Sequence, residues 1–274
     1  MDTRKIQQVG GGTYTVSIPV HWANEHDIEA GHTAYLYTHR DGSLVVRWDE
    51  KEHSELAATD IELNDTAPRV AKRMLRAAYS AGFKQIRLHN SEGVTSAQRR
   101  AIDTCTRSLT GVEIIEESTH HVTVQEVLDA SDVSIRQATS QLQYITLSMY
   151  EAALDFFAGD TTESEHIITR DDEADRLCQL IMRHFNRSLL ELAELDQLGI
   201  TRPRLFNYYV TARQLERVAD HAVKIARCTR RTDHAVSEEL LSESRAIGGE
   251  ARQVVERAST AIINGESIEM AHTA

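Results

Sequence analysis

Two pairs of acidic residues are candidates for binding a cation. Asp171 and Asp175 are four residues apart, and Glu216 and Asp220 repeat that spacing further along the chain. In an α-helix, residues at i and i+4 lie on one face, so each pair projects from one side of its helix. Carboxylate oxygens are the ligands of hard metal ions, and iron becomes a candidate when histidine joins them.

The two pairs can meet if the hairpin between their helices turns near residue 200. Asp220 then faces position 180, about five residues or roughly 7–8 Å along the helix axis from Asp175. One metal site built from both pairs is therefore expected. The alternative, that acids on exposed helix faces are solvated or bridge nearby arginines, stays open. Those arginines are Arg170, Arg213 and Arg217.

Basic residues gather in two places of an otherwise acidic chain. Arg4 and Lys5 stand opposite the triple-glycine turn 10–12 and are candidates for contact with nucleic-acid phosphates. A second cluster follows Pro68 at the spacing of a single helix face. It suits DNA phosphates or an acidic partner surface, and the alternative is a solvated helix face. This basic patch comprises Arg69, Lys72, Arg73 and Arg76.

Sequence signals for enzymatic chemistry are missing. The triple-glycine turn is not followed by Gly-Lys-Ser/Thr, and no Gly-x-Ser-x-Gly motif occurs. The three cysteines are far apart, which excludes a disulfide framework and a zinc ribbon. A di-iron site built from Glu-x-x-His strings would need Glu163 and Glu216 at the same height in the bundle. Along the helix axis, however, they would lie roughly 30 Å apart. We expect a protein that is not an enzyme and binds no nucleotide.

The composition indicates a cytoplasmic protein from a salt-rich cell. Among 274 residues, 42 are acidic and 30 are basic, which gives a formal net charge of −12. Arginine supplies most of the positive charge, and a solvated excess of carboxylates keeps a protein soluble in salt. No run of 18 apolar residues and no signal-peptide pattern occurs, so we expect neither a transmembrane segment nor export.

The period of the apolar pattern divides the chain into three parts. The predicted fold class is a mixed α and β fold that is mainly α-helical. Residues 1–52 indicate short strands and one short helix, with turns at 10–12 and at Asp41-Gly42. Residues 65–129 indicate a small α/β domain whose first helix runs from Pro68 to Gly82. Residues 131–265 predict an up-down helical bundle.

Four long helices are expected in the bundle, and the second and third carry the acidic pairs. The first has a seam of period 3.5 from Ile135 to Phe156. The second continues to Gly199, the third begins at Arg202-Pro203, and the fourth begins near Val236. Short connections make neighbouring helices antiparallel.

Motifs in the first fifty residues carry a family resemblance. The strings Arg4-Lys-Ile-Gln-Gln-Val-Gly, Thr15-Val-Ser-Ile-Pro19 and Ile28-Glu-Ala-Gly31 resemble the AbrB/SpoVT swapped-hairpin transcription factors over residues 3–49. The resemblance implies a strand-helix-strand unit that interlocks with a second copy. It thereby implies a homodimer that binds DNA.

A longer string lies in the predicted third helix of the bundle. Ala212-Arg-Gln-Leu-Glu-Arg-Val-Ala-Asp-His-Ala-Val-Lys-Ile225 resembles the PhoU phosphate-uptake regulators, and the likeness extends over roughly 131–232. The resemblance assigns the family's acid-x-x-x-acid elements to the two acidic pairs, which ligate iron or zinc clusters in some members. PhoU proteins usually carry two three-helix repeats, whereas the fourth helix here is only the start of a second.

The two resemblances together imply an archaeal regulator of phosphate uptake. It would act in transcription through a dimeric AbrB-like domain, with the PhoU-like bundle as a metal-binding sensor or docking module. The alternative is an adaptor that does not bind DNA and docks on a phosphate transporter ATPase or a sensor kinase. The α/β domain belongs to neither family, and its role is open.

Overall fold

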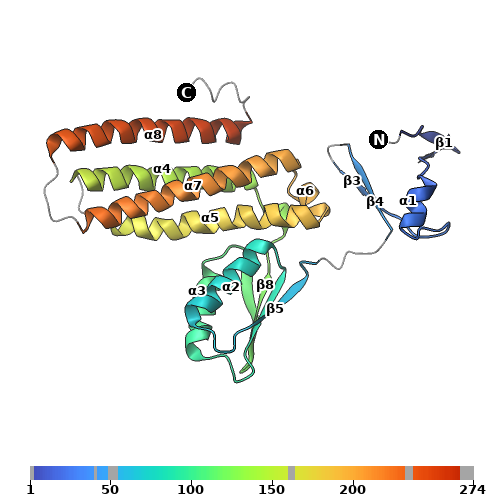
Figure 1. The fold of residues 1–274 in the computed structure, drawn as a ribbon, viewed down its shortest axis with the longest axis horizontal. Helices are drawn as coiled ribbons and strands as arrows, with labels where there is room; N and C mark the ends of the chain where they lie inside the picture. Colours follow the sequence, from blue (N-terminus) through green and yellow to red (C-terminus); the bar gives the residue numbers. More distant parts are fainter. Residues whose placement is uncertain (1–2, 40–41, 49–54, 160–163, 232–236, 266–274) are drawn as a thin grey trace. The chain divides into compact units, whose positions relative to one another are not determined.

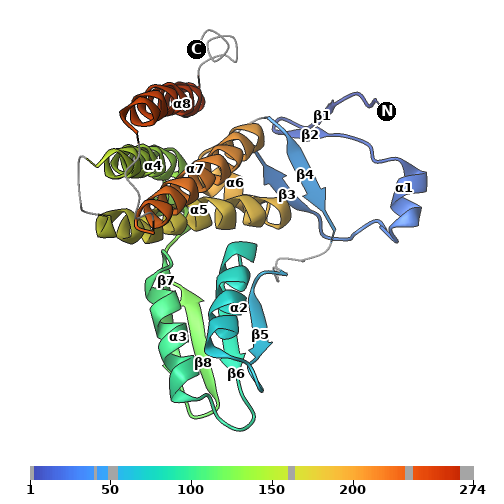
Figure 2. The same cartoon turned by 60° about the vertical axis from the view of Figure 1, so that its left-hand side comes forward.

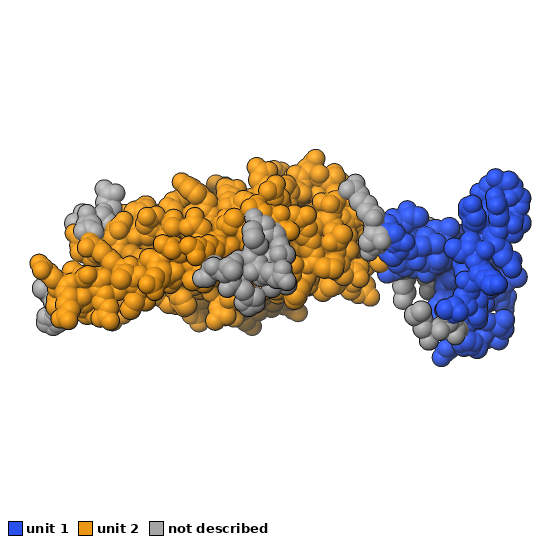
Figure 3. Space-filling model, turned by 90° about the horizontal axis from the view of Figure 1, so that it is seen from above, with its two compact units in different colours: residues 1–52 blue, residues 53–274 orange. Residues whose placement is uncertain are grey.

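A computed structural model describes residues 3–39, 42–48, 55–159, 164–231 and 237–265, whose elements are labelled in Figures 1 and 2. The chain forms two compact units, residues 1–52 and 53–274, which Figure 3 colours separately. Asp41, Glu163 and Val236, which enter the expectations above, lie outside the described residues.

Unit 1 consists of two short antiparallel hairpins and one helix. The first hairpin pairs β1 (Gln7–Val9) with β2 (Thr13–Thr15), and Gly10 in its turn has a φ of +65°. Helix α1 (Val20–Glu25) follows, and the second hairpin pairs β3 (Tyr35–Thr38) with β4 (Leu44–Arg47). Small β elements at the N-terminal end were predicted, and the structure confirms them.

The described residues of unit 1 form no buried core of their own. None of their side chains is buried, and eight large apolar side chains are between 41% and 73% exposed. Hairpins of this size need a hydrophobic face against another element to be stable. The exposed apolar residues are Ile6, Val9, Tyr14, Val16, Ile18, Val20, Leu36 and Leu44.

Unit 2 begins with a two-layer α/β segment (Figure 2). Its four-stranded sheet has the order β5-β6-β8-β7, with β5 parallel to β6 and the other pairs antiparallel. Ile86 and Leu88 of β6 are buried under the helices, whereas Arg87 between them is exposed. The elements are β5 (Ala58–Glu62), α2 (Pro68–Ala81), β6 (Gln85–His89), α3 (Ser96–Arg107), β7 (Val112–Glu117) and β8 (His121–Glu126).

Local signals explain most of this segment. Pro68 is in the first turn of α2, and Gly82 caps it with a φ of +109°. Thr95 and Gln98 form a capping box at the start of α3. Strand β5 is not evident in the sequence, because Ile61 is its single large apolar residue.

The second part of unit 2 is an up-down bundle in which successive long helices run in alternate directions (Figure 1). A mainly helical fold was predicted, and this bundle confirms it. Within the described residues, no helix is long and apolar enough to cross a membrane. The helices are α4 (Ile135–Ala158), α5 (Glu165–Leu190), α6 (Ala193–Gln197), α7 (Arg202–Thr229) and α8 (Glu238–Asn264), preceded by a 3₁₀ turn at Ala130–Asp132.

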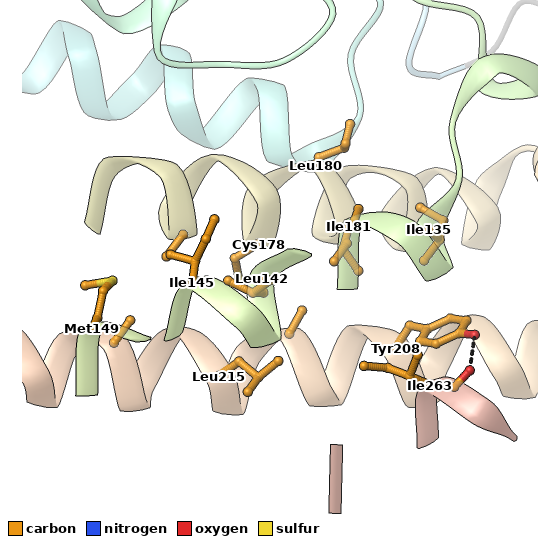
Figure 4. Close-up of a cluster of buried hydrophobic side chains, with 14 of the residues drawn as sticks. Ile135, Leu142, Ile145, Met149, Cys178, Leu180, Ile181, Tyr208, Leu215 and Ile263 are labelled. Atoms are coloured by element: carbon orange, nitrogen blue, oxygen red, sulfur yellow. Dashed lines mark hydrogen bonds between the residues drawn. The ribbon is translucent and has the colours of Figure 1, made fainter. Parts of the chain in front are cut away.

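The bundle core is formed mainly by α4, α5 and α7 (Figure 4). Leu142 and Met149 lie on the predicted seam of α4 and are fully buried against α5 and α7. The Tyr208 hydroxyl donates to the Ile263 carbonyl at 3.4 Å and ties α7 to the end of α8. Each buried aliphatic side chain of this kind contributes about 1.5–3 kcal/mol through the hydrophobic effect.

The expectation of one helix continuing to Gly199 is wrong. Helix α5 ends at Leu190, where Glu191 adopts an extended conformation, and the short α6 follows. This break turns the chain so that the Glu194 carboxylate reaches the His184 ring at 2.5 Å. Glu194 is fully buried. In a continuous helix the Glu194 carboxylate would not reach His184, and burying an unpaired carboxylate is costly.

Candidate functional site

The structure brings the two acidic pairs together along the contact of α5 with α7. Asp171 and Asp175 project from α5, while Glu216 and Asp220 project from α7. The negative charge of Asp220 raises the pKa of each of the other three carboxyls, so it lies near all of them. We call these four residues the carboxylate cluster.

Asp171 is the most strongly perturbed member of the cluster. Its pKa is raised to about 6, mainly by partial burial and then by the charges of Asp175, Asp220 and Asp172, against the opposing charge of Arg227. Burial also raises the pKa values of Asp175 and Glu216. Burial and like charges both disfavour the ionised form, so the cluster carries negative charge that a cation would stabilise.

Arginines partly neutralise the cluster. The Arg213 guanidinium lies 3.7 Å from the Glu216 carboxylate on the same helix. The Arg76 guanidinium reaches from α2 and lies 3.3 Å from the Asp175 carboxylate. Both pairs are partly exposed, so solvent screens them. Bridging by Arg213 is one of the alternatives left open by the sequence, whereas the contact from Arg76 was not anticipated.

The chemistry of the cluster suits a metal ion, but its geometry is not that of a closed metal site. Four oxygen donors fit a hard cation. Yet no group of three or more His, Cys, Asp or Glu side chains is arranged around a metal position among the described residues. Asp175 and Glu216 face guanidinium groups instead. A metal would therefore have to compete with arginine for these two carboxylates.

Asp171→Asn is expected to stabilise the metal-free protein at neutral pH. The pKa of Asp171 is raised in the folded state, so its contribution to stability falls as pH rises from about 4 to about 6. With solvent screening of a half-buried group, the variant should gain about 1 kcal/mol at pH 8 and nothing at pH 3.5. Urea unfolding in the presence of EDTA measures this change in the free energy of unfolding. The exposed neighbour variant Asp172→Asn should change little, and a gain independent of pH would refute the assignment.

The candidate nucleic-acid residues lie at the start of unit 1. Arg4 and Lys5 are exposed immediately before β1, and the Arg4 guanidinium donates to the Thr3 carbonyl at 3.2 Å. They are accessible to a ligand.

The four residues of the basic patch lie on α2. Arg69 and Arg73 are exposed, whereas Lys72 and Arg76 are half-buried. Arg76 contacts the bundle. Part of this patch therefore faces an acidic surface of the same chain.

A buried ionic network joins the α/β segment to the bundle, and no pattern in the sequence predicted it. Arg183 and Arg187 of α5 are 1% and 4% exposed, and both donate to the Glu126 carboxylate of β8, at 2.9 and 2.6 Å. Arg187 also pairs with Glu191 at 2.9 Å and with Glu194 at 3.1 Å. The i, i+4 spacing of Arg183, Arg187 and Glu191 is ordinary for a solvated helix face.

A comparison with protein families covers the region of the carboxylate cluster. The PhoU domain model matches residues 139–229, which run from the first turns of α4 to the end of α7. Searches of curated proteins and of solved structures gave no match. The matched domain supports a PhoU-like protein and suggests a role in the regulation of phosphate uptake.

Proposed function

We propose that this protein is a regulator of phosphate uptake that acts in transcription as a homodimer. The observation that carries the proposal is the PhoU domain match over α4–α7, the helices that hold the carboxylate cluster. The bundle would act as the sensor or docking module, and unit 1 would pair two copies and contact DNA. The protein is proposed to have no enzymatic activity of its own.

The exposed apolar surface of unit 1 supports the homodimer. Its hairpins leave Val16, Leu36 and similar side chains in solvent, although apolar patches of this extent usually mark contact surfaces. A second copy supplies the same surface and thus a self-complementary interface. The motifs quoted for the AbrB/SpoVT resemblance span these strands, so a swapped arrangement of hairpins is the proposed form of the dimer.

The basic residues of unit 1 support contact with DNA. A homodimer presents Arg4 and Lys5 twice, which gives four positive groups for phosphates. Each phosphate contact makes binding weaker in salt, with a slope of about −0.9 in log affinity against log salt concentration. In the salt-rich cell that the composition suggests, binding would also need base or shape contacts.

The adaptor is the second candidate, and the charge of unit 1 favours it. Residues 1–50 contain four basic residues and seven acidic ones, a balance that repels nucleic acid. In this case unit 1 would only dimerise, and the bundle would dock on a phosphate transporter ATPase or a sensor kinase.

A gel-shift assay separates the two candidates. The regulator should bind a phosphate-transporter promoter fragment specifically in molar KCl, and replacing Arg4 and Lys5 by alanine should weaken binding at least ~10-fold and reduce the salt slope. Arg257→Ala on α8 is the matched control and should bind as the parent protein does. Light scattering on the same sample should give twice 30.8 kDa. A dimer that binds no promoter at any salt concentration would favour the adaptor.

The carboxylate cluster is the proposed site for iron or zinc. Its four oxygen donors and its unbalanced negative charge support a cation there. No step of chemistry on a substrate is assigned to it. Phosphatase turnover that disappears in Glu216→Gln would contradict the non-enzymatic proposal and favour a metallohydrolase.

A further inference from the structure

Within the described part of the chain, helices cover only one face of the sheet in the α/β segment. Ile86 and Leu88 of the central strand β6 are buried on that face against α2 and α3. Successive side chains of a strand point to opposite faces, so Arg87 lies on the open face, where it is exposed. A cavity of about 360 Å³, which we call the sheet cavity, lies there. Its lining includes Asp60, Arg87, His89, Asn90, His120 and His121.

Three side chains at the end of β6 offer unused hydrogen-bond donors to the sheet cavity. Arg87 and His89 lie on the same face of the strand, and neither side chain has a hydrogen bond or an ion pair with a described residue. Asn90 is 7% exposed. Its Oδ1 accepts from the Glu92 amide at 3.0 Å, and its Nδ2 has no acceptor among the residues described. A buried donor without a partner is costly, so an acceptor on a ligand would stabilise this arrangement.

Two histidines at the start of β8 are already engaged by the protein. Nδ1 of His121 lies 2.7 Å from the Ser118 hydroxyl, and its Nε2 lies 3.1 Å from the Glu116 carboxylate. Nδ1 of His120 lies 3.3 Å from the Asn90 carbonyl oxygen. These contacts orient both rings as walls of the sheet cavity, and the donors left for a ligand are those of β6 and Asn90.

Asp60 adds an acceptor beside these donors. It is the register partner of Arg87 in the parallel strand β5, on the same face of the sheet. The two side chains form no ion pair, and Asp60 has no other partner among the described residues. An ionised carboxylate only accepts hydrogen bonds. The sheet cavity therefore suits a ligand with an anionic group for the donors and a hydroxyl group for Asp60.

We propose that the sheet cavity binds a small phosphorylated compound that also carries hydroxyl groups, such as a sugar phosphate. The planar guanidinium of Arg87 can donate two hydrogen bonds to phosphate oxygens, and His89 and Asn90 donate to the others. Asp60 accepts from a hydroxyl group. The volume of about 360 Å³ falls within the usual range of small-molecule sites and leaves room for the organic part.

The site gives the α/β segment a role as a ligand-binding module. It uses neither the carboxylate cluster nor any residue of unit 1. The inference therefore does not depend on the proposed regulatory function.

Calorimetric titration of the full chain tests the site with inorganic phosphate, glycerol 3-phosphate and glycerol. Glycerol 3-phosphate should bind and glycerol should not, because the phosphate group accepts most of the hydrogen bonds. Arg87→Gln should weaken binding of glycerol 3-phosphate at least ~10-fold, since hydrogen bonds to a charged group are lost. Arg100→Gln is the matched control, because it removes the same charge from an exposed residue of α3, and it should leave the affinity unchanged.

Asp60→Ala distinguishes a phosphate ester from free phosphate as the ligand. The variant should bind glycerol 3-phosphate more weakly, because a hydroxyl group of the ligand loses its acceptor. It should bind inorganic phosphate more tightly, because a like charge has been removed. Changes in the same direction for both probes would show that Asp60 does not recognise a hydroxyl group, and would overturn the assignment to a phosphate ester.

The imidazole signals of His89 in nuclear magnetic resonance spectra provide a readout that does not depend on heats of binding. Glycerol 3-phosphate should shift them in the parent protein and not, at the same concentration, in Arg87→Gln. The signals of His166, which is exposed on α5, should stay unchanged in both. A parent protein that binds neither phosphate probe, or an Arg87→Gln variant that binds as the parent does, would overturn the inference. The gel-shift result is independent of either outcome.

Discussion

Replacing Glu126 by alanine is expected to lower the free energy of unfolding by about 3–5 kcal/mol. The Glu126 carboxylate accepts hydrogen bonds from both Arg183 and Arg187, whose side chains are almost fully buried. Removing the Glu126 carboxylate leaves two buried, positively charged guanidinium groups without the negative group that they share. Urea unfolding followed by far-UV circular dichroism measures the loss.

Glu117→Ala is the matched control for this prediction. Glu117 belongs to the neighbouring strand β7 and pairs with Arg99, but its side chain is 52% exposed. A surface pair of this kind contributes about 0–1 kcal/mol, so the control should lose little. Equal losses in the two variants would show that the buried network is not held together by Glu126.

Local sequence signals predicted much of the fold because they act within a few residues. Pro68 and Gly82 mark the two ends of α2, and the seam from Ile135 to Phe156 corresponds to α4. Such signals depend on backbone geometry and on helical period, which a single sequence contains. The coarse arrangement of a mixed, mainly helical chain follows from them.

The break after Leu190 could not be predicted, because its cause lies outside the helix. The apolar pattern continues through Leu192 and Leu195, so periodicity alone extends α5 to Gly199. The chain turns instead to bring Glu194 to His184 and Arg187. Tertiary partners of a buried charge thus override local helix propensity.

The candidate site was predictable in part for the same reason. The i, i+4 spacing within each acidic pair is local, and a hairpin between α5 and α7 brings the pairs to similar heights. Arg76 is 99 residues from Asp175 along the chain, and no period or motif links them. The cation that the cluster faces was therefore not predictable from the sequence.

Gly82→Ala is expected to destabilise the protein by about 2–4 kcal/mol. Gly82 caps α2 with a φ of +109°, a conformation that costs a residue with a side chain about 1–2 kcal/mol. A Cβ atom there would also lie 2.5 Å from Cγ of Arg187 and 3.2 Å from Cδ1 of Leu56. Arg187 cannot swing aside freely, because Glu126 and other acids hold its guanidinium.

Gly159→Ala separates the backbone effect from the steric one. Gly159 caps α4 with a φ of +82°, and none of the atoms described lies within 4 Å of its hypothetical Cβ. This variant should lose only the backbone part, about 1 kcal/mol. The excess loss in Gly82→Ala would then measure how rigidly the ionic network holds Arg187 against α2. If both variants lose the same free energy of unfolding in urea, the Arg187 side chain moves aside easily. The contact between the α/β segment and the bundle is then less rigid than its hydrogen bonds indicate.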